Sequence, residues 1–99
     1  MTPSIMQDER KCYATGAGIH LDRHHVFKGS RRNASERNGL WVWLRHDVHM
    51  AMHDHCPPWE KLESALKIAA QRAFEANGGT REEFMREFGA NYIEEGDGQ

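Results

Sequence analysis

The sequence is poor in cysteine and has no long apolar run, and each shortage excludes a class of protein. Its 99 residues include two cysteines, Cys12 and Cys56, which could pair, but a reducing compartment favours free thiols. No segment approaches the roughly 20 apolar residues of a membrane span. The first ten residues also lack the apolar centre of a signal peptide. These absences predict a cytoplasmic protein that does not contact membranes.

Apolar residues are scarce overall. They make up 38% of the chain, and the mean hydropathy is −0.82. A chain of this length is near the size at which a single core just sustains itself. We therefore expect one domain at residues 11–93, between a flexible arm at 1–10 and a disordered tail at 94–99. A bound metal ion would help to stabilise so small a core.

Charge is unevenly divided along the chain. Residues 10–45 contain eight Lys or Arg and two acidic residues, whereas residues 46–99 contain five Lys or Arg and eleven acidic residues. The overall net charge of −2 therefore conceals a basic first half and an acidic second half. Such a division suggests that one face of the protein meets a polyanion.

Turn residues and apolar periodicity predict an α+β fold. Thr15–Gly18 supplies turn chemistry inside the first extended segment, and a polar loop is expected at 28–39. A capping box, Thr80 with Glu83, begins the last helix, which ends at Gly89. The expected elements are, in chain order, a hairpin at 11–27, a strand at 40–44, and helices at 45–55, 58–77 and 80–89.

Histidine is the residue type that stands out. All seven histidines lie between residues 20 and 55, and two of them, His24 and His25, are adjacent. If 45–55 is helical, His49 and His53 lie on one face, one turn apart. That spacing presents two imidazoles to a single metal ion, although such pairs are often merely solvated. A looser alternative pairs His46 with His49 or with Asp47.

The adjacent pair can complete this candidate site. One histidine of the pair can supply a third ligand from the end of a strand. The other can stay unligated and act as a general base. Three neutral ligands leave the cation its charge and an open position for a phosphate oxygen. The residues alone therefore indicate a metal site suited to phosphodiester chemistry.

The order of these features resembles the HNH, or ββα-metal (His-Me finger), nuclease family. A histidine doublet, a basic glycine-containing loop, a strand and a His-x-x-x-His segment follow one another in "HHVFKGSRRNASERNGLWVWL" and "HDVHMAMH". His24 precedes His49 by 25 positions, and His53 follows four later, which is similar to the DNase colicins and related bacteriocins. With the later "REEFMREFGANYI", the chain also looks like small phage-encoded HNH-like proteins.

This resemblance implies a fold and a function. The expected fold is a small ββα-metal hairpin-plus-helix core at 19–55 with two additional C-terminal helices. The implied function is a metal-dependent DNA endonuclease, phage-encoded and active in the cytoplasm of a bacterial host. The family uses one divalent ion, for which Zn²⁺ is expected first and Mg²⁺, Mn²⁺ or Ni²⁺ are alternatives.

The resemblance also implies roles for individual residues. His24, His49 and His53 would hold the ion, and His25 would activate water. Asp22 lies two residues before the doublet, where an acidic side chain can orient a histidine. Sequence-independent contacts to the DNA backbone would come from the basic loop, namely Lys28, Arg31, Arg32 and Arg37.

Two departures from the family pattern leave a second function open. The asparagine that fixes the base histidine is replaced by Leu40, so Asn38 or else Asn33 would have to substitute, or the orienting bond is missing. The structural zinc of many members is also lost, because Cys12 lacks the three partner cysteines. The alternative is a metal-stabilised, non-catalytic module that inhibits or modulates a host protein.

Overall fold

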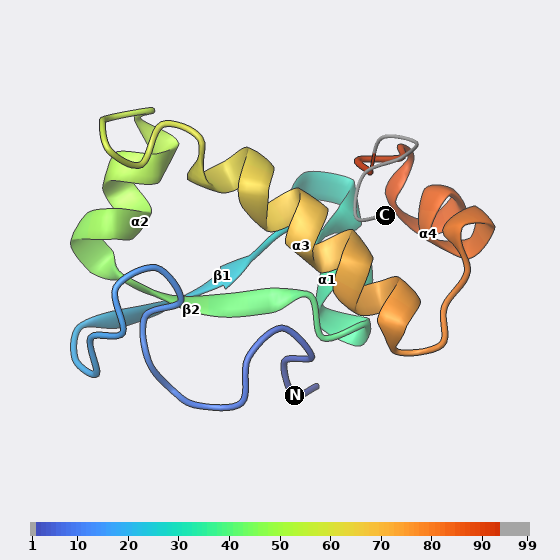
Figure 1. Ribbon diagram of the computed structural model, residues 1–99, viewed down its shortest axis with the longest axis horizontal. Coiled ribbons are helices and arrows are strands. Elements are labelled where there is room, and N and C mark those ends of the chain that lie inside the picture. The colour runs from blue at the N-terminus through green and yellow to red at the C-terminus, as the bar shows by residue number, and fades with distance from the viewer. Residues whose placement is uncertain (1, 94–99) are drawn as a thin grey trace.

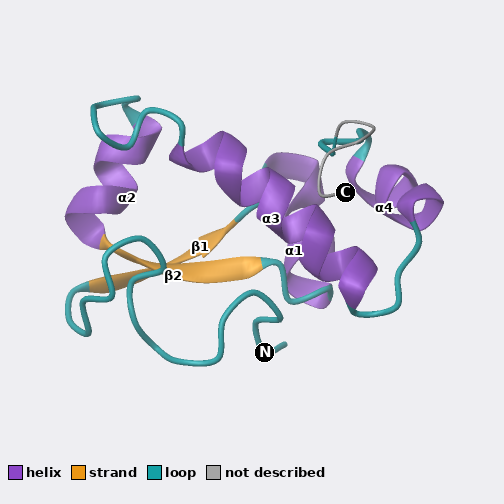
Figure 2. Cartoon of the chain, in the orientation of Figure 1, coloured by secondary structure: helices purple, strands orange, loops and turns teal. Residues whose placement is uncertain are grey.

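Two short strands of branched and aromatic residues form the centre of the fold. The computed structural model describes residues 2–93, in which β1 (Leu21–His25) pairs with β2 (Trp41–Arg45) as a two-stranded antiparallel sheet. The register sets His24 opposite Val42 and Leu21 opposite Arg45. Four α-helices complete the described part, which confirms the α+β class (Figures 1 and 2).

The expected hairpin at 11–27 is wrong. The partner of β1 is β2, and the residues before β1 form turns, with the Gly16 N–H donating to the Cys12 carbonyl at 2.8 Å. The Tyr13 N–H donates to the Trp43 carbonyl at 2.8 Å and so ties this segment to the sheet. Thr15–Gly18 is therefore a turn, as expected, but it does not join two strands. The turn residues identified a change of direction without identifying the strand that pairs.

The segment expected as a polar loop also contains helical structure. A 3₁₀ turn, η1 (Gly29–Arg31), leads into α1 (Arg32–Arg37). Only Ala34 and Ser35 of α1 are buried, so the sequence shows no apolar periodicity there. The Ser35 hydroxyl accepts from the Phe27 N–H at 3.3 Å and donates to the Leu40 carbonyl. α1 is thus held by backbone contacts that no sequence pattern displays.

The remaining helices are confirmed, with shorter bounds than expected. α2 (His46–His53) follows directly on β2, α3 (Leu62–Ala76) runs back over the domain, and α4 (Arg81–Phe88) closes it (Figure 1). α3 starts late because the residues after the two prolines form turns. The capping box of Thr80 and Glu83 is present, and Gly89 ends α4 in the left-handed conformation with φ of 80°. None of these described helices is long and apolar enough to cross a membrane.

The core lies between the sheet and the last two helices. Aromatic rings from β1's end and α4 pack together, with Phe27 and Phe88 centroids 4.4 Å apart. Val42 and Leu44 of β2 are fully buried and belong to the same core cluster. α2 contributes only Val48 and Met52 to the core. α2 is therefore joined to the core by two buried apolar side chains.

The N-terminal segment lies along the outer edge of β2. The Ser4 hydroxyl donates to the Trp41 carbonyl at 2.6 Å, and the Ile5 N–H donates to the Gly39 carbonyl at 2.9 Å. These bonds cover backbone groups that an edge strand would otherwise expose. The mobility expected for residues 1–10 stays a prediction, and the expected disordered tail at 94–99 lies outside the described residues.

Replacing Gly39 by alanine should destabilise the domain more than replacing Gly16. Both glycines have positive φ, 69° and 81°, so each variant incurs about 1–2 kcal/mol of backbone strain. A Cβ at Gly39 would also clash with the Pro3 carbonyl, whereas nothing lies near a Cβ at Gly16. Overpacking adds about 1–3 kcal/mol. Urea denaturation measures the two losses, and equal losses would show that the N-terminal segment is not docked there.

Candidate metal centre

Strand register and helix phase bring three histidines together. His24 lies on the buried face of β1, with 3% of its surface exposed. Because α2 starts where β2 ends, it packs on β1 and presents His49 and His53, one turn apart, to His24. Ring centroids lie 5.1 Å apart for His24 and His49, 5.8 Å for His24 and His53, and 4.7 Å for His49 and His53. One nitrogen from each ring lies within 4.8 Å of the other two.

This geometry fits a divalent ion. The His49 and His53 Nε2 atoms are 3.1 Å apart. Two Zn–N bonds of about 2.0–2.1 Å at a tetrahedral angle place their nitrogens roughly 3.3 Å apart. The His24 Nε2 atom is buried and has no hydrogen-bond partner among residues 2–93. A buried polar atom without a partner is rare and costly, and an ion would satisfy it. His24, His49 and His53 can therefore hold one metal ion together.

Electrostatics keeps the buried ligand in its metal-binding form. Burial, together with the nearby charges of His49 and Lys28, lowers the pKa of His24 to about 3. Burial and the charge of Lys28 also lower the pKa of His53. A metal binds neutral imidazole and must otherwise displace a proton. Two of the three ligands are thus held neutral by their surroundings.

Asp22 is the carboxylate that orients a ligand. Its Oδ2 atom accepts from the His49 Nδ1 atom at 2.9 Å and from the His46 Nδ1 atom at 2.7 Å. The bond from His49, followed by that from His46, lowers the Asp22 pKa, although burial acts in the opposite direction. The orienting contact that the sequence suggested for Asp22 is therefore made to His49 of α2. Its catalytic role stays a prediction.

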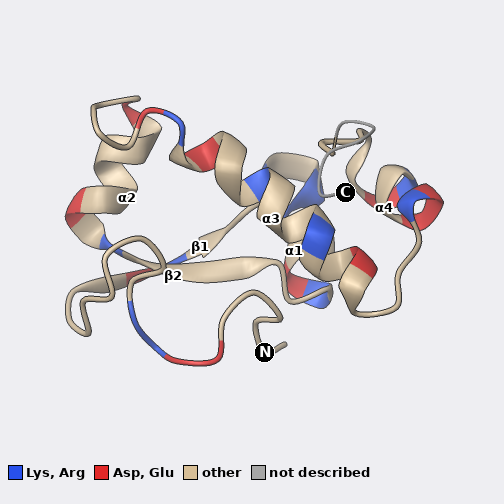
Figure 3. Ribbon diagram, viewed as in Figure 1, with Lys and Arg blue, Asp and Glu red and all other residues tan. Residues whose placement is uncertain are grey.

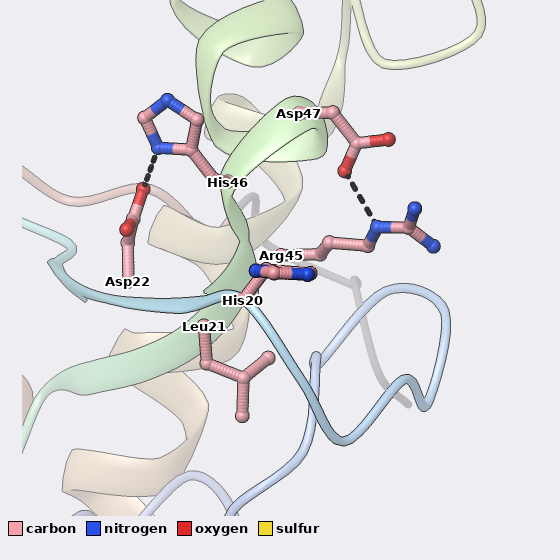
Figure 4. A pocket seen from close by; sticks show the side chains of 6 residues that line it. All are labelled: His20, Leu21, Asp22, Arg45, His46 and Asp47. Atoms are coloured by element: carbon pink, nitrogen blue, oxygen red, sulfur yellow. Dashed lines mark hydrogen bonds and ion pairs between the residues drawn. The ribbon is translucent and has the colours of Figure 1, made fainter.

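His46 is a neighbour of the site that the sequence pattern left without a role. Its ring and Asp22 point toward one another at the rim of an open hollow of about 460 Å³, which also includes Arg45 and Asp47 (Figure 4). His46 lies three residues before His49 on α2, so both reach the same carboxylate. Helical phase was the signal that could have found it.

The three clustered histidines, His24, His49 and His53, are called the triad below. His25 faces away from the triad, toward α1. Its Nε2 atom lies 2.8 Å from the Glu36 Oε1 atom, and its Nδ1 atom accepts from Arg32 Nε at 3.5 Å. Glu36 also pairs with Arg23 at 2.7 Å. These side chains, with Asn33, line a second open hollow of about 310 Å³. Glu36 was missed because α1 itself could not be recognised in the sequence.

Asn38 does not bond His25 in the structure. Its side-chain amide donates to the Ala34 carbonyl at 2.8 Å and so closes the end of α1. Leu40, at the family's asparagine position, is fully buried in the core. Glu36 therefore makes the contact to His25 that was expected from Asn38. A functional role for Asn38 stays a prediction.

The two charged halves of the sequence interleave in space. Lys28 pairs with Glu63 of α3 at 2.8 Å, and Arg37 pairs with Glu87 of α4 at 3.3 Å. Arg31 donates to the Glu87 carbonyl at 2.8 Å. Blue and red segments accordingly alternate over the helices in Figure 3. Lys28 and Arg37 are thus paired with carboxylates of the second half, and Arg31 with a backbone carbonyl of it.

Known proteins offer no match to this chain. No family model, curated protein or solved structure is detectably similar to it. The function is therefore inferred from the residues and their geometry.

Both cysteines are free, Cys12 buried and Cys56 exposed.

Zinc titration should give one bound ion per chain. His24→Gln, His49→Gln and His53→Gln should each abolish stoichiometric binding, because three neutral ligands are needed. The matched control is His55→Asn, which replaces an exposed histidine of positive φ by a residue that tolerates this conformation. Elemental analysis after dialysis gives the stoichiometry. Full occupancy in the His24 variant would remove it from the ligand set.

Acid should destabilise the protein partly through Glu36. The bond from His25, followed by that from the Thr2 N–H and then the charge of Arg23, lowers the Glu36 pKa from 4.5 to about 2, although burial acts in the opposite direction. A depressed pKa stabilises the fold above pH 4.5, and this contribution is lost as pH falls toward 2. Glu36→Gln should therefore flatten the pH dependence of unfolding in that window. Glu82→Gln, at an exposed position, should retain the wild-type slope.

Proposed function

We propose that the protein is a metal-dependent DNA endonuclease of the HNH type, with β1, β2 and α2 as its ββα-metal core. The observation that carries the proposal is the convergence of His24 from β1 with His49 and His53 from α2. The connection between the strands carries basic residues, as in the family that the sequence resembles. Three nitrogen ligands favour Zn²⁺ over Mg²⁺, which prefers oxygen, and Mn²⁺ and Ni²⁺ are alternatives.

A divalent ion in this position would stabilise negative charge on a phosphate and on a leaving 3′ oxygen. The chain's own residues supply the remaining chemistry. Because Glu36 is ionised, it can only accept, so the proton of neutral His25 resides on Nε2. The His25 Nδ1 atom, which accepts from Arg32 at 3.5 Å, would then be the basic nitrogen that takes a proton from an attacking water once Arg32 turns to the phosphate.

Substrate contacts in this proposal come from the basic side chains around the His25 hollow and the loop before α1. Arg32 lies at the hollow beside His25, and Lys28 begins the loop. Phosphate contacts of this kind are independent of base sequence and weaken as salt rises. DNA is thus the proposed partner, bound through its backbone.

The second candidate is the non-catalytic binding module. It is favoured by one observation: His24 contacts α2 whereas His25 contacts α1, so ligand and base leave opposite faces of β1. A metal that serves only to lock α2 against β1 would satisfy the triad equally well. This candidate binds a host protein and requires no reaction at His25.

Nicking of supercoiled plasmid separates the two candidates. With Zn²⁺, Mg²⁺, Mn²⁺ or Ni²⁺ added, wild type should cut, and His25→Ala should cut about 10²–10⁴-fold more slowly, the usual contribution of a general base. The variant should keep its metal, since His25 is outside the triad. His55→Asn is the matched control and should cut normally.

Each contrary result has a definite meaning. A wild-type protein that holds its ion but cuts no form of DNA with any of the four metals would establish the binding module in place of the nuclease. If His25→Ala cuts as fast as wild type, His25 is not the base. Zinc content is measured on the same samples to separate loss of chemistry from loss of the ion.

A further inference from the structure

Lys28 lies between a ligand histidine and a carboxylate. Its Nζ atom is 3.1 Å from the His53 Nδ1 atom and 2.8 Å from the Glu63 Oε2 atom. Glu63 stands in the first turn of α3 and is half-buried. The Lys28–Glu63 pair thus borders the metal site of the proposed function. A role for this pair in metal binding rests on that site.

The hydrogen bonds around the triad fix which ring nitrogen of His49 and of His53 carries the proton. Asp22 can only accept, so the His49 proton is on Nδ1 and the His49 Nε2 atom carries a lone pair. The contact of 3.1 Å between the two Nε2 atoms then requires the proton of His53 on its own Nε2. This leaves a lone pair on His53 Nδ1, and the Lys28 ammonium, which can only donate, faces it.

This arrangement cannot persist when an ion binds. To ligate through Nε2, His53 must carry its proton on Nδ1 instead. That N–H would then face the Lys28 ammonium, donor against donor and beside a divalent cation. Of the two carboxylates whose charge acts on His53, Glu63 and Asp54, Glu63 is the one that lies 2.8 Å from the Lys28 nitrogen that contacts His53, and it is able to accept from this N–H. A ligand histidine usually donates its second nitrogen to such a carboxylate.

We propose that Glu63 orients His53 in the metal-bound protein and that Lys28 gives up its contact with His53 when the ion enters. Glu63 then does for His53 what Asp22 does for His49. The Lys28 ammonium competes with the ion in the metal-free state and is released by binding. Metal loading thereby frees one cation of the basic loop for an anionic ligand.

Zinc affinity of the full chain, measured by competition with a chromophoric chelator, tests this exchange. Lys28→Met keeps the apolar stem and removes the competing donor, so it should bind zinc roughly tenfold tighter, the worth of about one hydrogen bond. Glu63→Ala should bind about 10–100-fold more weakly. Glu63→Gln retains an acceptor and should recover part of this loss. Lys67→Met, in the same hollow as Lys28 and Glu63, and the exposed Glu60→Ala are matched controls expected within twofold of wild type.

The double variant distinguishes two roles for Glu63: it either orients His53 or only holds Lys28 in place. If Glu63 acts on His53, Lys28→Met/Glu63→Ala binds zinc at least tenfold more weakly than Lys28→Met alone. Equal affinity of these two proteins overturns the inference, as does a Lys28→Met protein no tighter than wild type. None of these measurements uses DNA cleavage, so failure of the nuclease proposal leaves them intact. A wild type without zinc affinity would refute the metal site and this exchange together.

Discussion

Burial of the His24 imidazole between β1 and α2 is the constraint on which the rest of the site depends. The ring is 3% exposed, and its Nε2 atom has no partner within residues 2–93. An unsatisfied buried polar atom costs about 1–3 kcal/mol. His49 and His53 are the side chains that surround this nitrogen. An ion shared by the three rings would convert that cost into a bond between the sheet and α2.

The position of the triad complements the distribution of apolar packing. Phe27, Phe84 and Phe88 hold β1's end against α4, at the far end of the sheet from α2. α2 buries only two side chains, Val48 and Met52. A metal at this end would stabilise the part of the domain that the aromatic core does not reach. Structural stability and any chemistry at the site would therefore share one ion.

The alternation of side chains along β1 separates the two histidines of the doublet. His24 enters the triad, whereas His25 joins Glu36 and Arg32 at α1. His24 is thus surrounded by the histidines of α2, whereas His25 contacts a carboxylate and an arginine of α1. The strand keeps the proposed ligand and the proposed base adjacent in the chain but gives them independent surroundings. A single phosphodiester that uses both must therefore span the edge of β1.

The sequence by itself determined the features that depend on local spacing. His49 and His53 share a helix face because they are four residues apart, and the α4 boundaries follow from the Thr80–Glu83 box and from Gly89. The α+β class and β2 also followed from local patterns. His24 could be nominated as the third ligand only through a resemblance in spacing to a known family.

Tertiary structure alone decided the partners that come from elsewhere in the chain. Glu36 reaches His25 because α1 folds onto β1, and α1 has too few buried residues to produce a periodic signal. Glu63 lies 35 positions after Lys28 in the chain. It meets Lys28 because α3 packs beside α2. β1 pairs with β2 rather than with the segment before it, because the turn at Thr15–Gly18 brings no strand of its own. Such contacts depend on the packing of whole elements, which residue spacing does not encode.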